Sequence, residues 1–170
     1  MNLNSATPRV LALDLRSRSM GFVVFEGPDE LLDWGVRSLR DVAGRSVPVG
    51  HRLAPLLSEF QPTVVLLKSS AQERLRRKPH LEDVLDTIES EGDGRIAVRF
   101  ISPQQIDGLF HGGVRNKNYL AAQVAKAFPD LAWKLPAPRI KIWQREHYRM
   151  SIFDAAALAL AYYGHRASER

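Results

Sequence analysis

The stretch that decides the fold is Val10–Phe25, VLALDLRSRSMGFVVF. Its two apolar runs, residues 9–15 and 21–25, are typical of β-strands, and the polar RSRSM segment between them is short enough for a hairpin connection. Asp14 lies in the first run, where a carboxylate is costly to bury unless it is paired or bound to a cation. A structural role, in which the Asp14 carboxylate caps the following turn, would also explain an aspartate at this position. The stretch predicts a hairpin with a candidate functional residue near its turn.

The residues that follow this hairpin have the apolar patterns of an α/β domain. Residues 31–39 predict a third strand of a meander, and residues 63–67 and 96–101 predict two further strands. Apolar residues at helical spacing predict helices over 51–60, 81–88 and 116–128, and the alanine-rich residues 151–163 predict a last helix. A meander followed by alternating strands and helices is typical of a mixed five-stranded sheet flanked by helices.

Length and composition favour a single domain over residues 1–170. The chain has no cysteine, which excludes disulfides and thiolate metal sites. No apolar run is long enough for a membrane span, and the first residues lack the layout of a signal peptide. We expect a cytoplasmic protein.

Positive charge is concentrated in two segments of the chain. Residues 68–78 and 134–149 each hold five basic residues and one acidic residue, so each carries +4 and the rest of the chain carries −3 of the total of +5. Two basic clusters in predicted loops favour a phosphate-binding surface. The candidate nucleic-acid-binding residues in these segments are Arg74, Arg76, Arg77, Lys78, Lys134, Arg139, Lys141, Arg145 and Arg149.

Lys68 stands directly after the apolar run of residues 63–67, which reads as a strand buried on both faces. Open α/β folds usually place their chemistry at the ends of such strands. A second carboxylate, Asp154, lies in the first turn of the predicted last helix, where the helix dipole alone would explain it. The alanines that follow would let this helix approach the sheet closely, so Asp14 and Asp154 could converge. Two close carboxylates need a cation, typically Mg²⁺.

Three segments together resemble the RuvC-type resolvases of the RNase H-like superfamily. VLALDLRSRSMGFVVF is similar to the opening hairpin of that family, PTVVLLK to its fourth strand, and SIFDAAALALAYY to its last helix. The resemblance covers nearly the whole chain and implies an RNase H-like fold, binding of branched DNA, and Mg²⁺ or Mn²⁺ held by carboxylates for phosphodiester hydrolysis. By position, Asp14 and Asp154 match two of the family's metal-binding aspartates.

The chain departs from the resemblance at two of the four carboxylate positions. Lys68 stands where a metal-binding glutamate is expected, and Ser151 stands where a further aspartate is expected. Glu146, about two helical turns before Asp154, is a candidate substitute, and Glu73 is another. His147 is a candidate base or ligand, although a surface histidine is the more common case.

A lysine at this position suggests two hypotheses. In the first, Lys68 pairs with both Asp14 and Asp154 and competes with a divalent cation, so that the site binds Mg²⁺ weakly or not at all. In the second, Lys68 replaces the charge of one metal ion and stabilises negative charge developing at phosphorus. The first is favoured, since an ammonium group at the centre relieves the repulsion between the carboxylates directly.

The sequence therefore predicts a RuvC-like protein that binds structured DNA or RNA, with an altered and inactive metal site. Two alternatives remain open. One is an active Mg²⁺-dependent endonuclease that uses Asp14, Asp154 and a substitute acid such as Glu146 as its catalytic residues. The other is an interaction protein that uses the basic face for a protein partner. RuvC-type resolvases are dimers, so the resemblance also implies a possible homodimer.

Overall fold

The computed structural model describes residues 7–69, 79–108, 117–134 and 148–168. Its strands are β1 (Arg9–Leu15), β2 (Ser19–Glu26), β3 (Leu31–Ser38), β4 (Val64–Lys68) and β5 (Ala97–Ile101). Its helices are α1 (Val49–Phe60), α2 (Pro79–Gly92), α3 (Pro103–Asp107), α4 (Lys117–Ala127), the 3-10 helix η2 (Pro129–Lys134) and α5 (Met150–Ser168). The predicted hairpin, meander and strand–helix alternation are therefore confirmed.

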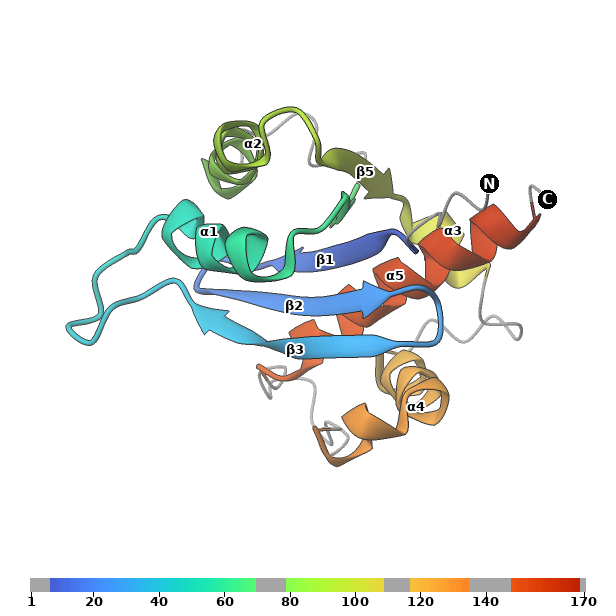
Figure 1. The fold of residues 1–170 in the computed structure, drawn as a ribbon. Helices are drawn as coiled ribbons and strands as arrows, with labels where there is room; N and C mark the ends of the chain where they lie inside the picture. Colours follow the sequence, from blue (N-terminus) through green and yellow to red (C-terminus); the bar gives the residue numbers. More distant parts are fainter. Residues whose placement is uncertain (1–6, 70–78, 109–116, 135–147, 169–170) are drawn as a thin grey trace.

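The five strands form one mixed sheet in the order β3-β2-β1-β4-β5. The meander β1–β2–β3 is antiparallel, whereas β4 lies parallel to both β1 and β5. Helices α1 and α2 cover one face, and α5 covers the other with α4 packed against it (Figure 1). Because β1, β4 and β5 run in the same direction, their carboxyl ends meet at one end of the sheet, beside the β1–β2 turn.

The central strands are buried on both faces, as their apolar runs predict. In β1, Val10 and Ala12 belong to the core under α5, while Leu11 and Leu13 belong to the core under α1 and α2. This alternation is the two-residue period of a strand, applied to a sheet that is covered on both sides. The first four residues of β4 are likewise buried and its fifth, Lys68, is exposed. Lys68 is thus the last residue of the strand.

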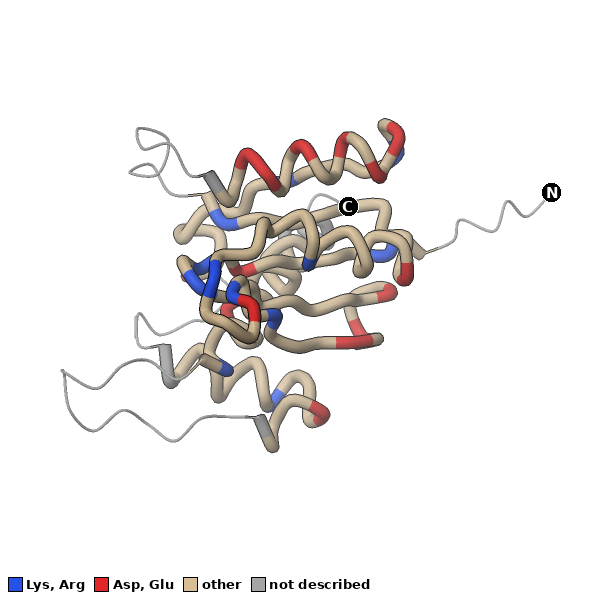
Figure 2. Tube along the Cα trace, turned by 90° about the vertical axis from the view of Figure 1, so that its left-hand side faces the viewer, with Lys and Arg blue, Asp and Glu red and all other residues tan. Residues whose placement is uncertain are grey.

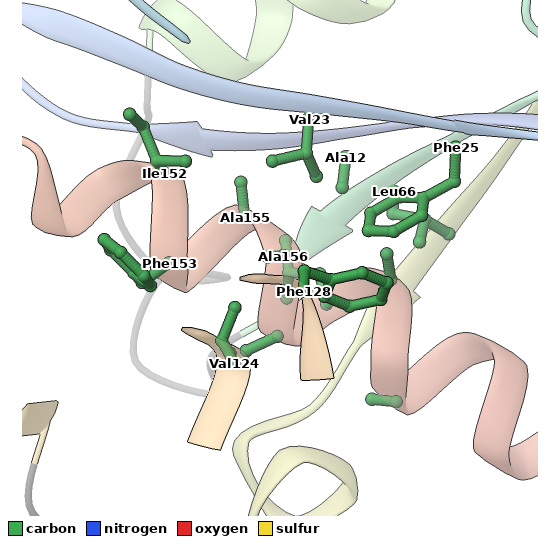
Figure 3. Packing of buried hydrophobic residues seen from close by; sticks show 14 of the residues in the cluster. Ala12, Val23, Phe25, Leu66, Val124, Phe128, Ile152, Phe153, Ala155 and Ala156 are labelled. Carbon is green, nitrogen blue, oxygen red and sulfur yellow. The ribbon is translucent and has the colours of Figure 1, made fainter. Parts of the chain in front are cut away.

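Small side chains let α5 lie close to the sheet. Its alanines at positions 155, 156, 157, 159 and 161 are all buried. Figure 3 shows Ala155 and Ala156 beneath Val23 and Ala12, with α4 packed on the opposite side of the helix. At the rim of this core, the rings of Phe25 and Phe128 meet edge to face with centroids 5.0 Å apart. The predicted close approach of the last helix is confirmed.

Several element boundaries differ from those predicted. Helix α5 begins at Met150, so Asp154 is its fifth residue and lies in the second turn. The prediction that Asp154 lies in the first turn is therefore wrong, and the helix dipole explains this carboxylate less well. Helix α1 begins two residues earlier than expected, and β3 ends at Ser38. Among the helices in the described part of the chain, none combines the length and apolarity that a membrane span requires.

Candidate functional site

Asp14 lies near the carboxyl end of β1, opposite Gly21 of β2. Strand alternation places it on the same face as Ala12, which is the face that α5 covers. Its side chain is 14% exposed. A carboxylate so nearly buried needs a partner.

Gly21 and Ser151 bring the last helix against the hairpin at this point. A Cβ atom added at Gly21 would lie 2.5 Å from the backbone oxygen of Ser151, which is closer than real Cβ atoms approach other atoms. Only glycine therefore allows α5 to begin where it does. One turn further along α5, Asp154 comes to the same end of the sheet as Asp14, with its side chain 16% exposed. The predicted convergence of Asp14 and Asp154 is observed.

Arg16 joins the two carboxylates. Its Nε donates to Oδ2 of Asp14 at 2.7 Å, and its second guanidinium nitrogen, NH2, donates to Oδ2 of Asp154 at 2.7 Å. These lengths are typical of charge-assisted hydrogen bonds. One guanidinium thus connects the first strand to the last helix across 138 positions of sequence. Arg16 is not among the residues predicted from the sequence, although an arginine two residues after a strand aspartate was the available signal.

Lys68 lies beside this cluster without entering it. Asp14 and Lys68 each follow the last parallel pair between β1 and β4, Leu13 with Leu67. The Lys68 side chain is exposed, and among the described ion pairs none joins it to Asp14 or Asp154. The ion pairing predicted for Lys68 is made by Arg16 instead.

Ser151 occupies the position where the resemblance implies a further aspartate. Its side chain is fully buried, and its hydroxyl donates to the backbone oxygen of Tyr148 at 2.9 Å. This bond satisfies the hydroxyl at the start of α5 and adds no negative charge to the site. A larger, charged side chain would have to fit against the backbone of Gly21.

The residues present here do not fit the two divalent metal ions that the resemblance implies. Over residues 7–69, 79–108, 117–134 and 148–168, no group of three or more His, Cys, Asp or Glu side chains is arranged to hold a metal ion. One oxygen of each aspartate already accepts from Arg16. The candidate substitutes Glu73, Glu146 and His147 lie outside the described residues. Mg²⁺ requires several oxygen ligands around it, and this site presents two carboxylates that share a guanidinium.

Most of the predicted nucleic-acid-binding residues lie outside the described part of the chain. Lys134 ends η2, and Arg149 directly precedes α5. The guanidinium of Arg149 stacks over the Tyr148 ring at 5.7 Å, and its Nε donates to the Tyr148 hydroxyl at 3.2 Å. The predicted residues outside the described ranges are Arg74, Arg76, Arg77, Lys78, Arg139, Lys141 and Arg145.

A further group of arginines, absent from the predicted set, lies at the same end of the sheet as the carboxylate pair. It comes from the β1–β2 turn, the end of β3, the loop after β3 and the start of α1, and we call it the arginine edge: Arg18, Arg37, Arg40, Arg45 and Arg52. The backbone oxygen of Arg18 accepts from Leu39, and Arg52 Nε donates to the backbone oxygen of Ser38, so the contributing segments are in contact. Figure 2 views this end of the sheet and shows the basic residues gathered there.

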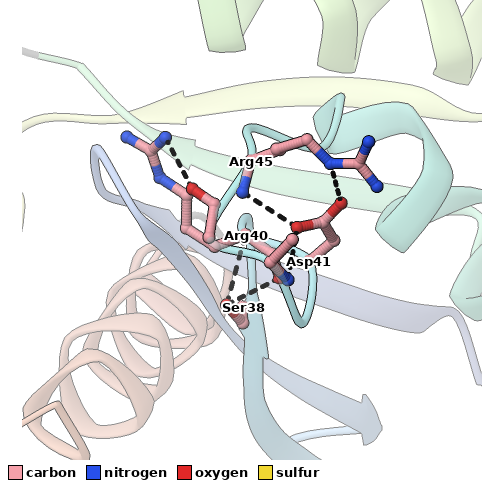
Figure 4. Close-up of polar contacts among 6 residues, drawn as sticks. Ser38, Arg40, Asp41 and Arg45 are labelled. Atoms are coloured by element: carbon pink, nitrogen blue, oxygen red, sulfur yellow. Dashed lines mark hydrogen bonds and ion pairs between the residues drawn. The ribbon is translucent and has the colours of Figure 1, made fainter.

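Asp41 organises the loop that carries part of the arginine edge. Its Oδ1 accepts from the backbone N–H groups of Ala43 and Arg45, and its Oδ2 accepts from Arg45 Nε at 2.8 Å (Figure 4). Gly44 completes the turn at a φ of +78°, a conformation that side chains disfavour. The pKa of Asp41 is held below its usual range, chiefly because the Arg45 backbone N–H donates to the carboxylate, with further help from the Arg45 side chain. The loop is thus fixed by local hydrogen bonds.

We expect the Asp41 carboxyl to titrate at a lower pH in the folded protein than in urea. Since its pKa is lowered by folding, its stabilising effect is present above the pKa of the unfolded chain and is lost as the pH falls through the lower folded value. NMR of the side-chain carboxyl, with the Ala43 and Arg45 amide shifts, measures both the midpoint and the opening of the loop. Equal midpoints in the folded and unfolded protein would contradict this prediction.

Three solved structures resemble this chain along nearly its whole length. RuvC of T. thermophilus in complex with a Holliday junction substrate matches with a TM-score of 0.66 and 19% identity, covering 95% of this chain and 96% of its own. A second Thermus thermophilus RuvC structure matches with a TM-score of 0.61 and 22% identity, covering 94% and 96% of the two chains. The Fowlpox virus resolvase in complex with Holliday junction DNA matches with a TM-score of 0.58 and 15% identity, covering 92% and 99%.

No protein-family model and no curated protein sequence matches the chain. The structural likeness therefore rests on the path of the backbone: the meander, the two parallel strands and the last helix crossing beneath them. The protein has the RNase H-like fold, in the form shared by RuvC and the poxvirus Holliday junction resolvase.

Proposed function

We propose that this protein binds branched DNA at the end of the sheet that carries Asp14, Asp154 and the arginine edge, and that it does not cleave DNA by two-metal hydrolysis. The observation that carries the proposal is the fold, which it shares with two proteins whose structures were solved with Holliday junction DNA. The arginine edge supports it, because a nucleic-acid backbone requires positive charge along its path.

Charge balance supports this location for DNA. Asp14 and Asp154 share the charge of Arg16, and Asp41 is paired with Arg45. The remaining arginines of the edge and the exposed Lys68 give this end of the sheet a net positive charge. Guanidinium groups bind phosphate oxygens in a bidentate manner, which suits them to hold a backbone without reading its sequence. In the sequence, the basic residues 70–78 follow β4 and the basic residues 135–147 precede α5.

The proposal that DNA is not cleaved rests on two features of the site, namely Lys68 and the contacts of Arg16. Lys68 provides a positive charge where the resemblance implies a metal-binding glutamate, and Arg16 already binds both remaining carboxylates. Two-metal hydrolysis depends on cations that clamp the attacking and leaving oxygens. Among the described residues the ligands for such cations are incomplete, so Asp14, Arg16 and Asp154 can bind and orient a phosphate but supply no activated water. Two copies of the chain on one junction remain a prediction.

The experiment is a gel shift with a four-way junction and with a linear duplex of the same total length, at about 50 mM and about 200 mM salt. We expect binding that prefers the junction and weakens steeply at the higher salt concentration. The same mixtures with Mg²⁺ or Mn²⁺ should contain no cleaved strand. No binding at low salt would contradict the nucleic-acid proposal, whereas metal-dependent cleavage would contradict only its second part.

Two double variants test whether DNA binds specifically at the arginine edge or is attracted by the overall positive charge of the protein. The double variant Arg18→Gln/Arg40→Gln should bind the junction several-fold more weakly, and the slope of log K against log salt should fall by about 2. The matched control is Arg95→Gln/Arg99→Gln, which removes the same charge. Arg95 precedes β5 and Arg99 lies within it, on the edge strand, away from the β1–β2 turn. Equal weakening by both double variants would contradict a DNA site at the arginine edge.

A further inference from the structure

The carboxylate pair already contains a cation, and that cation belongs to the chain itself. Arg16 donates from Nε to Asp14 and from its NH2 nitrogen to Asp154, both at 2.7 Å. The Arg16 side chain is 26% exposed, and the two aspartates are less exposed. Because the group is partly buried, its charges are screened less than those of a surface ion pair.

Arg16 spans the two carboxylates as a divalent ion would. A guanidinium presents several N–H donors in one rigid plane, so that it can bind two acceptors at once. A lysine ammonium at the same place would be a point charge on a flexible stem. Arginine side chains in proteins are effectively always charged, so a guanidinium is not lost from such a contact by deprotonation.

The elements on either side of this contact come from opposite ends of the chain. Asp14 and Arg16 belong to the first hairpin, whose turn is closed by Arg16 N donating to the oxygen of Ser19 at 2.9 Å. Asp154 belongs to the last helix, which the backbone contact between Gly21 and Ser151 holds in place. Arg16 therefore ties the last helix to the first hairpin, a connection that bridging metal ions would otherwise provide.

We propose that Arg16 takes the place of the metal ion at this site, so that the folded protein holds Asp14 and Asp154 together without a divalent cation and takes up none there. This inference concerns the same residues as the proposed function, but it is tested on the protein alone. Its failure can therefore be told apart from a failure to bind DNA.

The decisive variant is Arg16→Gln, which removes the charge and shortens the side chain. Its matched control is Arg99→Gln, since Arg99 is an exposed arginine on the edge strand β5. Thermal unfolding is followed in EDTA and in millimolar Mn²⁺ or Mg²⁺, and Mn²⁺ binding is measured by electron paramagnetic resonance. Unmodified protein and Arg99→Gln should unfold at the same temperature in EDTA and in metal, and should bind no Mn²⁺ through these aspartates.

Arg16→Gln should unfold several degrees lower in EDTA and recover most of that difference in Mn²⁺, because two carboxylates without a counter-cation then attract one. If Arg16→Gln is not folded in EDTA, its refolding with and without Mn²⁺ gives the same readout. Stoichiometric Mn²⁺ binding by the unmodified protein that Asp154→Asn abolishes would overturn the proposal. So would an Arg16→Gln protein whose unfolding temperature does not rise in metal, since a merely structural contact would show no such recovery.

Discussion

Replacing Gly21 by alanine should lower the free energy of unfolding by about 3 kcal/mol, the upper end of the usual cost of overpacking. The reason is steric, because the new Cβ would lie 2.5 Å from the backbone oxygen of Ser151 and 2.6 Å from its carbonyl carbon. A backbone cannot rotate away as a side chain can, so α5 has to shift from β2. For a domain of this size, 3 kcal/mol corresponds to roughly 6–12 °C in Tm.

The shift of α5 should also separate Asp154 from Arg16, since Asp154 lies one turn beyond Ser151 on the same helix. Chemical denaturation measures the stability, and hydrogen exchange along α5 reports whether its start has moved. Gly108→Ala is the matched control, because a Cβ there would lie 3.4 Å from its nearest neighbour, in ordinary contact. A loss of stability at Gly21 no larger than at Gly108 would contradict the close approach of helix and hairpin.

Lys68→Glu should strengthen metal binding about a hundredfold when it is added to Arg16→Gln. The substitution changes the charge at position 68, next to the carboxylate pair, by two units. With the full screening of bulk water, two charge units at roughly 6 Å from a divalent ion are worth about 3 kcal/mol. The comparison is between the Mn²⁺ dissociation constants of Arg16→Gln/Lys68→Glu and of Arg16→Gln alone.

The place of Lys68 in the sheet supports this prediction. Asp14 and Lys68 each lie one residue beyond the pair formed by Leu13 and Leu67 on adjacent parallel strands. Neighbouring strands are about 4.8 Å apart, so a glutamate at position 68 can reach an ion held by Asp14. Arg16→Gln/Lys126→Glu is the control, because Lys126 is exposed on α4. Equal affinities for the two double variants would show that position 68 does not face the carboxylate pair.

Local pattern in the sequence predicted the elements of this fold well. The apolar runs of β1 and β4 indicated strands buried on both faces, and the alanines of α5 indicated a helix that lies close to the sheet. Such patterns repeat every two residues in a strand and about every 3.6 residues in a helix, so they can be recognised within a short stretch of sequence. Burying the apolar face of each element then leaves few ways to pack the helices on the sheet. The same reasoning indicated that Asp14 and Asp154 could converge if the last helix packs on the sheet that carries Asp14, and both conditions are observed.

The pattern predicted the boundaries and the polar contacts less well. Helix α5 begins before the residue expected, which moved Asp154 into the second turn. The arginine edge is scattered over residues 18–52, so no window of the sequence shows it as a basic cluster. Its members gather because the hairpin turn, the end of β3 and the start of α1 meet at one end of the sheet.

Local pattern in the sequence predicted the strands, the helices and the covering of both faces of the sheet, and it indicated that two aspartates from distant segments could converge. The folded structure shows that they do converge and which cation holds them together. Lys68 and Arg16 both stand beside Asp14 in the fold, but Arg16 binds both carboxylates and Lys68 is exposed. Which carboxylates a side chain can reach depends on the conformation of the turn that carries it and on how closely α5 packs against β2 at Gly21. Both are properties of the folded chain, and local sequence pattern does not predict them.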